Sequence, residues 1–117
     1  MFINLTNHPS SGWSEEQLIA AHQYGEIVDL SFPIIEPTFT KDEILLLVKE
    51  CTDAIMAMKD GNTVVHVMGE MTFTHNIVNT LKGAGIVCIA STTERHVKMT
   101  PDGKKISEFK FVQFREY

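Results

Sequence analysis

Residues 63–69 read Thr-Val-Val-His-Val-Met-Gly, and this stretch decides the fold. A nearly continuous apolar run that ends at a glycine is typical of a strand inside a parallel sheet covered on both faces. Residues 86–90, Ile-Val-Cys-Ile-Ala, repeat the pattern farther along the chain. Parallel neighbours need a crossover between them, so we expect a helix in the intervening residues.

Strands and helices alternate on both sides of this run. Two capping boxes, Ser14–Gln17 and Thr40–Glu43, mark helix starts, and Gly25 and the Asp60-Gly61 pair mark helix ends. The expected strands are Phe2–Thr6, Glu26–Ser31, Thr63–Met68 and Ile86–Ala90, and the expected helices run from Ser14 to Tyr24, from Thr40 to the Asp60-Gly61 stop, and from Glu70 to Lys82. Residues 93–99 and 105–114 alternate imperfectly around Pro101-Asp-Gly103, which predicts a hairpin.

This order predicts an α/β fold made of a single domain, residues 1–117. Helices alternate with strands, so right-handed crossovers place them on both faces of a parallel sheet. We expect a small Rossmann-like three-layer sandwich with parallel strand order 2-1-3-4. A C-terminal antiparallel β-hairpin then adds edge strands.

Composition excludes several classes of protein. The 117 residues suffice for one core, and a net charge of −5 speaks against non-specific binding of long nucleic acid. No apolar run is long enough for a membrane span, and no signal peptide is recognisable, so we expect a cytoplasmic protein. Cys51 and Cys88 lie in apolar runs without metal-ligand spacing, which predicts free thiols. No pair of histidine and carboxylate has the i, i+4 spacing of a metal site, so we expect no metal, and we expect no cofactor.

Three polar segments are expected at one rim of the sheet. In a doubly wound sheet, ligands bind at the carboxyl ends of the strands where the crossovers diverge, here between the first and third strands. Residues 7–13 and 69–74 follow these two strands, and residues 91–95 follow the fourth. A helix N-terminus with one arginine can hold a phosphate without a net positive charge. We therefore predict a site for a small phosphate-bearing ligand.

Gly69-Glu-Met-Thr-Phe-Thr74 stands at a strand-to-helix junction. Free N–H groups near Met71 and the hydroxyls of Thr72 and Thr74 are candidates for binding phosphate oxygens. Glu70 fits better as an acceptor for a ribose hydroxyl or a base amine, or as a partner of an arginine. Alternatively, Gly69 only makes the turn and one threonine caps the helix.

The loop after the first strand supplies Asn7, His8, Ser10 and Ser11 as candidate ligand contacts. His8 is a candidate general acid or base, because its ordinary pKa lies near neutrality. Its alternative role is that of a loop histidine bonded to backbone. Trp13 is a candidate for stacking on a base or, alternatively, a lid over the first helix.

Arg95 is one of two arginines in the chain and follows Thr92 and Thr93, which are further candidate ligand contacts. A guanidinium there would bind phosphate and stabilise developing negative charge, so Arg95 joins His8 as a candidate catalytic residue. The alternative is a salt bridge from Arg95 to Glu94 or Glu70. His66 lies inside an apolar strand, and we interpret it as a core histidine with satisfied hydrogen bonds.

Residues 4–10 with Trp13 and Gln17, residues 66–74, and residues 91–95 together resemble a group of short bacterial CRISPR-associated proteins. The group looks like a minimal CRISPR-associated Rossmann-fold (CARF) domain, and the resemblance covers nearly the whole chain. It implies a homodimer that binds a cyclic oligoadenylate across its two-fold axis. The related ring nucleases cut such rings without a metal, which implies phosphodiester cleavage as a possible activity here.

Two other functions stay open. The same rim would serve a small-molecule or mononucleotide binding module outside CRISPR signalling. Alternatively, the chain is a regulatory homodimer whose hairpin and aromatic tail form an interface, with Phe109, Phe111, Phe114 and Tyr117 in contact.

Overall fold

The computed structural model describes residues 1–117, which form a five-stranded sheet with three α-helices and one short 3₁₀ helix. The elements are β1 (Phe2–Leu5), η1 (Ser10–Gly12), α1 (Glu15–His22), β2 (Ile27–Asp29), α2 (Lys41–Met58), β3 (Val64–Val67), α3 (Met71–Gly83), β4 (Val87–Met99) and β5 (Lys105–Glu116). None of the helices combines the length and apolarity that crossing a membrane requires. The predicted α/β class is confirmed.

The strand order is β2-β1-β3-β4-β5, with the first four strands parallel and β5 antiparallel to β4. One part of the prediction is wrong. The expected strands 86–90 and 93–99 are a single strand, β4, because no glycine or proline interrupts Ser91-Thr-Thr93 and threonine favours extended backbone. The hairpin therefore adds one edge strand rather than two.

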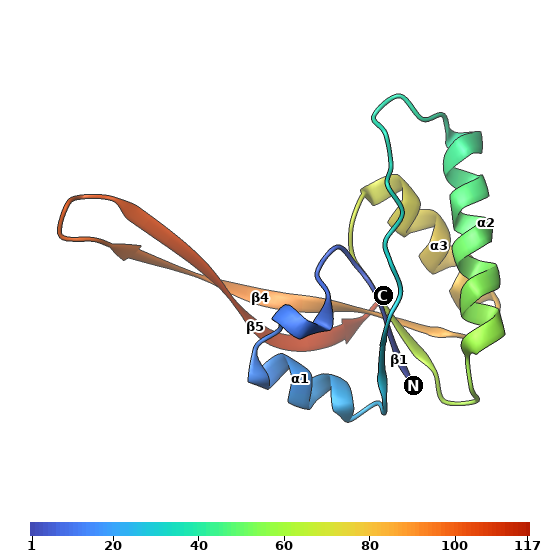
Figure 1. Ribbon diagram of the computed structural model, residues 1–117, viewed down its shortest axis with the longest axis horizontal. Helices are drawn as coiled ribbons and strands as arrows, with labels where there is room; N and C mark the ends of the chain where they lie inside the picture. The colour runs from blue at the N-terminus through green and yellow to red at the C-terminus, as the bar shows by residue number, and fades with distance from the viewer.

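The sheet is covered on both faces, as the apolar central strands predict (Figure 1). Side chains alternate along β1, so Ile3 and Leu5 pack with α2 and α3, while Phe2 packs with Ala21 of α1 on the other face. The larger cluster contains 13 buried residues, the smaller one four. The face of the sheet that α1 covers thus has fewer buried apolar residues than the opposite face, and it also carries polar side chains.

Both capping hydroxyls are where the sequence places them. The Ser14 side chain accepts from the Gln17 N–H, and the Thr40 side chain accepts from the Glu43 N–H. Helix α1 ends at His22, two residues before the predicted end, and Gly25 follows with a φ of 120°. That left-handed geometry suits a residue without a side chain.

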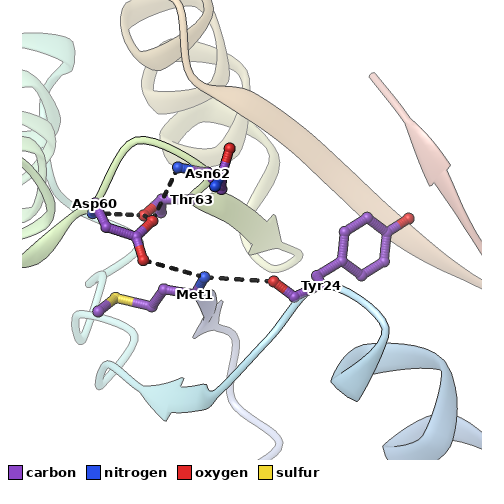
Figure 2. A network of polar contacts seen from close by, with 5 residues as sticks. All are labelled: Met1, Tyr24, Asp60, Asn62 and Thr63. Carbon is purple, nitrogen blue, oxygen red and sulfur yellow. Dashed lines mark hydrogen bonds and ion pairs between the residues drawn. The ribbon is translucent and has the colours of Figure 1, made fainter.

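The amino-terminal edge of the sheet is closed by a polar network (Figure 2). The α-amino group of Met1 donates to the carbonyl oxygen of Tyr24 at 3.3 Å and lies 3.6 Å from the Asp60 carboxylate. The hydroxyl of Thr63 and the backbone N–H of Asn62 donate to the same carboxylate, and these hydrogen bonds lower the pKa of Asp60. The polar groups at this edge therefore form hydrogen bonds and an ion pair with one another.

Both cysteines are free thiols, as predicted. Cys88 is buried in the larger apolar cluster, and burial raises the pKa of its thiol to about 11. Burial also raises the pKa of the half-buried Cys51. Neither thiol is ionised near neutral pH, so both behave as apolar packing groups.

The β4–β5 hairpin projects far beyond the rest of the molecule (Figure 1). We call residues 93–111 the arm, and the remainder of the sheet with its helices the body. Pairing along the hairpin shifts once, because Thr92 faces Gln113 while Thr93 faces Phe111. Val112 is therefore the extra residue of a β-bulge, which explains why the alternation in this segment is imperfect.

Candidate functional site

A cavity of about 810 Å³ opens on the α1 side of the sheet at the carboxyl ends of β1 and β3. Its walls come from the loop after β1, the start of α1, the end of β3, and the two strands of the hairpin. The lining residues are Thr6, Asn7, His8, Gly12, Trp13, Ser14, Glu16, Gln17, His66, Met68, Gly69, Ser91, Thr93, Phe109, Lys110 and Phe111. Its volume is in the range typical of small-molecule sites.

Four of the predicted site residues meet at this cavity: Asn7, His8, Gly69 and Thr93. They come from three segments far apart in the sequence. The backbone of His8 is held firmly, because its carbonyl oxygen accepts from Asn4 Nδ2 at 2.9 Å and from Trp13 Nε1 at 3.0 Å. The imidazole of His8 makes no hydrogen bond of its own, so a fixed loop presents a free ring.

Three predicted contacts in the same segments are turned elsewhere. The Ser10 hydroxyl donates to Asp29 at 2.7 Å, and the Thr92 hydroxyl donates to the carbonyl oxygen of Gln113 at 3.2 Å. Ser11 lies exposed in η1 and does not line the cavity. Alternation along β4 explains Thr92, since Ser91 and Thr93 lie on the cavity face and Thr92 on the other.

The structure does not bring Arg95 to the cavity wall. It lies two residues beyond Thr93 on β4, opposite Phe109, and its guanidinium donates to the Ser107 hydroxyl at 3.0 Å and 3.3 Å. Neither expected glutamate pairs with it. Arg95 is therefore a residue of the arm and lies outside the cavity. Its spacing in the sequence does not predict this position.

The N-terminus of α3 is already occupied by a side chain of this chain. Glu70 is the cap residue, and its carboxylate accepts from the Thr72 N–H at 2.8 Å and the Phe73 N–H at 2.9 Å. These bonds lower the pKa of Glu70. The N–H groups of Thr72 and Phe73 are therefore not free to bind phosphate, and the alternative of a threonine cap is wrong. The expected contact of phosphate with the backbone at Gly69 to Met71 stays a prediction. A carboxylate at a helix N-terminus already satisfies the amides that a phosphate would need.

A second cavity, of about 520 Å³, adjoins the first through Met68 and Gly69. It also contains the predicted residues Met71 and Thr74, whose buried hydroxyl has no hydrogen-bond partner. Thr72 lines neither cavity. Within the predicted segment 69–74, Gly69 therefore lines both cavities, whereas Met71 and Thr74 line only the second.

Gly69 owes its identity to packing. A Cβ at this position would lie 2.3 Å from the ring of Phe32. The same ring packs edge-on against Phe73, with 5.0 Å between centroids. The glycine therefore lets the loop after β2 close over the start of α3, and its predicted approach to a ligand stays a prediction.

A buried polar chain beneath the cavity was missed by the sequence analysis. Asn4 and His66 are register partners on the parallel strands β1 and β3, and both are almost fully buried. Asn4 Nδ2 donates to Asp29 Oδ1 at 2.8 Å, while Asn4 Oδ1 lies 3.0 Å from His66 Nδ1. Burial raises the pKa of Asp29, but hydrogen bonds from Asn4 and Ser10 outweigh it and hold that pKa below its usual value.

His66 is only half satisfied, which corrects the interpretation of it as a fully bonded core histidine. Its Nε2 is buried without a hydrogen-bond partner, although the residue lines the cavity. Burial lowers the pKa of His66 to about 4, so the ring is neutral at physiological pH. An unpaired buried polar atom costs roughly 1–3 kcal/mol, which is a reason to look for a function.

Trp13 combines the two roles considered for it. Its indole packs edge-on against Phe2 at 5.8 Å and against His66 at 5.6 Å between ring centroids, which makes it a lid on the α1 face. It also lines the cavity, so its remaining surface is available to a ligand.

Phe109 and Phe111 line the cavity, although the sequence suggested them for an interface, and Lys110 between them also lines it. The bulge at Val112 changes the alternation of β5, and Phe111 consequently lies beside Phe114, with 4.9 Å between ring centroids. The spacing of the aromatic residues in this tail was the available sequence signal. It does not show which face of β5 each ring occupies, because that depends on the bulge.

The charge at the cavity wall is nearly balanced. Glu16 and Lys110 are the carboxylate and the ammonium group among the lining residues, and His8 and His66 add two imidazole rings. Hydroxyls, amides and aromatic rings make up most of the remaining functional groups. The arrangement favours stacking and hydrogen bonding over strong attraction of a highly charged ligand.

The model of the uncharacterized protein MJ1673 family matches residues 1–115. The chain belongs to this family. No curated protein and no solved structure matches it. The MJ1673 family match covers the whole arm, every residue of the larger cavity, and every residue of the second cavity except Tyr117.

Proposed function

We propose that this protein binds a nucleotide in the larger cavity, and that a cyclic oligoadenylate is its ligand. The observation that carries the proposal is the meeting of the loop after β1, the end of β3 and the base of the arm around one cavity. This is the edge of an α/β sheet where nucleotides bind in many unrelated proteins. The identity of the ligand rests on the resemblance to CARF domains.

The lining residues supply the contacts that a nucleotide needs. Trp13, Phe109 and Phe111 present aromatic surface on which an adenine ring can stack. Asn7 and Thr93 supply hydrogen-bonding groups for a sugar or a base edge. These contacts recognise the uncharged parts of the ligand.

The phosphates of a ring would need more positive charge than one cavity provides. Lys110 is the ammonium group at the wall, and Arg95 is exposed farther out on the arm. A ring that spans two copies of the chain would meet both residues twice. We therefore propose a homodimer as the binding unit, with Arg95 in contact with phosphate.

Cleavage of the ring is the second part of the proposal. Attack of a ribose 2′-oxygen on the adjacent phosphorus forms a 2′,3′-cyclic phosphate and breaks the bond to the 5′-oxygen of the next nucleotide, which leaves as a hydroxyl. The step needs a group that accepts the 2′-hydroxyl proton and returns a proton to the leaving oxygen, and a group that stabilises the developing charge. His8 offers a free imidazole at the cavity wall for the first task, and Arg95 a guanidinium for the second.

A mononucleotide is a second candidate ligand. The nearly balanced charge of the lining residues favours it, because a single phosphate requires only Lys110. Dimer formation is then unnecessary for binding.

Titration calorimetry with cyclic tetra-adenylate, cyclic hexa-adenylate and adenosine 5′-monophosphate tests these ligands. Parallel incubation with labelled rings in EDTA detects metal-independent cleavage. We expect a cyclic oligoadenylate to bind at micromolar protein, with one ring per two chains. Absence of binding by all three compounds would overturn the proposal, and binding of the monophosphate alone would favour the second candidate.

Two variants refine the test. Arg95→Ala is expected to weaken ring binding by about tenfold, since a charged hydrogen bond is lost. Arg115→Ala is the matched control, because Arg115 is the other arginine and does not line the larger cavity. Equal effects of the two substitutions would remove Arg95 from the site.

A further inference from the structure

The Asn4–His66 pair determines which nitrogen of the imidazole carries the proton. Asn4 Nδ2 faces two acceptors, the Asp29 carboxylate at 2.8 Å and the carbonyl oxygen of His8 at 2.9 Å. The amide must therefore turn its NH₂ group to them and its oxygen to His66. Because Asn4 Oδ1 can only accept, His66 Nδ1 is the donor across their 3.0 Å contact.

The other ring nitrogen is consequently an acceptor. A neutral imidazole has one N–H, so Nε2 of His66 presents a lone pair. No side chain or backbone group donates to it. The rings packed around His66 are those of Phe2, Trp13 and Phe114, which hold the imidazole in place.

Nε2 is a buried atom of a residue that lines the cavity. The opposite edge of the ring, with Nδ1, is turned to Asn4. Trp13 packs edge-on against this ring and lines the same cavity. Access of a ligand to the lone pair therefore requires the side chains over the ring to move.

We propose that Nε2 of His66 accepts a hydrogen bond from an uncharged N–H or O–H group of the ligand, so that this point of the cavity selects a base amine or a sugar hydroxyl and rejects phosphate. The inference rests on the proposed nucleotide site, and it adds which part of the ligand lies deepest. An unprotonated nitrogen cannot donate to a phosphate oxygen, and its lone pair repels one. Asp29, Asn4 and the backbone of His8 are positioning groups that fix this polarity.

The first test needs no ligand. Long-range ¹H–¹⁵N spectra of the imidazole ring distinguish a proton on Nδ1 from a proton on Nε2. We expect Nδ1–H for His66 at neutral pH, and we expect Asn4→Leu to weaken this preference because it removes the oxygen that accepts from Nδ1. A proton on Nε2 in the unaltered protein would overturn the inference, whatever the protein binds.

The second test uses adenosine, 2′-deoxyadenosine, inosine and inorganic phosphate as probes. The Nε2 signal and the fluorescence of Trp13, the single tryptophan, are the readouts. Adenosine is expected to shift the Nε2 signal and phosphate to leave it unchanged. Loss of the shift with inosine identifies the amine as the donor, and loss with 2′-deoxyadenosine identifies the 2′-hydroxyl.

A matched pair of substitutions isolates the acceptor. His66→Asn places an amide N–H near the position of Nδ1 and keeps a donor for Asn4, but it removes the acceptor from the cavity. His66→Gln places an oxygen near the position of Nε2 and restores it. We expect adenosine to bind about tenfold more weakly to His66→Asn, with recovery in His66→Gln. Thermal melts show whether both variants fold.

The outcomes separate the two proposals. If adenosine shifts the Nε2 signal while no cyclic oligoadenylate binds, the proposed ligand is wrong and the role of His66 stands. If rings bind while the Nε2 signal and His66→Asn are without effect, the role of His66 is wrong and the proposed function stands. If none of the four probes moves the Nε2 signal, the inference fails.

Discussion

Strands β1 and β3 are each four residues long and are buried at every position. Strands β4 and β5 extend for 13 and 12 residues. Strand β4 is mostly exposed from Thr93 onward, and β5 is mostly exposed along its whole length. The body thus depends on apolar burial from both faces of the sheet. The arm depends on backbone pairing between two strands, which by itself is marginally stable in water. The cavity lies where the two regions join, so its floor is formed by buried strands of the body and one wall by exposed strands of the arm.

The largest difference between the regions is expected on truncation of aromatic side chains. Phe73→Ala in the body removes a fully buried ring that packs on Phe32, and we expect a loss of about 3–5 kcal/mol of unfolding free energy. Phe109→Ala in the arm removes a ring that is 68% exposed, and we expect a change within about 0.5 kcal/mol. Urea unfolding measures both, and similar losses would contradict the comparison.

Acid is expected to weaken the body through His66. Its pKa is about 4 in the folded protein against an ordinary 6.5, so between these values the unfolded state binds more protons. The unfolding free energy therefore falls as pH drops from about 6.5 to about 4, by an amount on the order of 3 kcal/mol, and the contribution is constant outside that window. The difference between unaltered protein and His66→Asn across this range isolates the effect. A pH-independent difference would refute it.

Gly69→Ala tests the contact between the loop after β2 and α3. The added Cβ would lie 2.3 Å from the Phe32 ring, and we expect the displacement to cost about 1–3 kcal/mol. Gly12→Ala is the control, because nothing lies within 4 Å of a Cβ there. The double variant Gly69→Ala with Phe32→Leu is expected to recover part of the loss, and absence of any recovery would place the strain elsewhere.

Shortening the arm is expected to have the smallest effect on stability. Replacing residues 97–107 by Asn-Gly leaves the His96–Glu108 pair to close a two-residue turn. The unfolding free energy should change by less than about 1 kcal/mol, because the removed residues bury little apolar surface. Sedimentation of the same variant shows whether the arm joins two copies, as the proposed homodimer requires. A large loss of stability would show that the body depends on the arm.

Much of the candidate site followed from topology, since the carboxyl ends of parallel strands meet at one edge. This placed residues 7–13 and 69–74 together and brought His8 and Gly69 to a shared cavity. It did not identify the Asn4–His66 pair, because the sequence of one strand does not reveal which of its polar side chains has a register partner on the neighbouring strand. It also could not foresee that Glu70 caps α3, since a carboxylate and a threonine are both acceptable at a helix start.

The sequence by itself determined the order of the elements, the strand order of the parallel sheet and the free state of both cysteines. Apolar periodicity, caps and turn residues act over a few neighbouring residues, and a chain displays such local signals directly. The tertiary structure alone decided where Arg95 points, which face Phe109 and Phe111 occupy after the bulge, and which nitrogen of His66 lacks a partner. Each of these depends on a strand or loop distant in sequence, so the physical cause lies in contacts that local patterns do not encode.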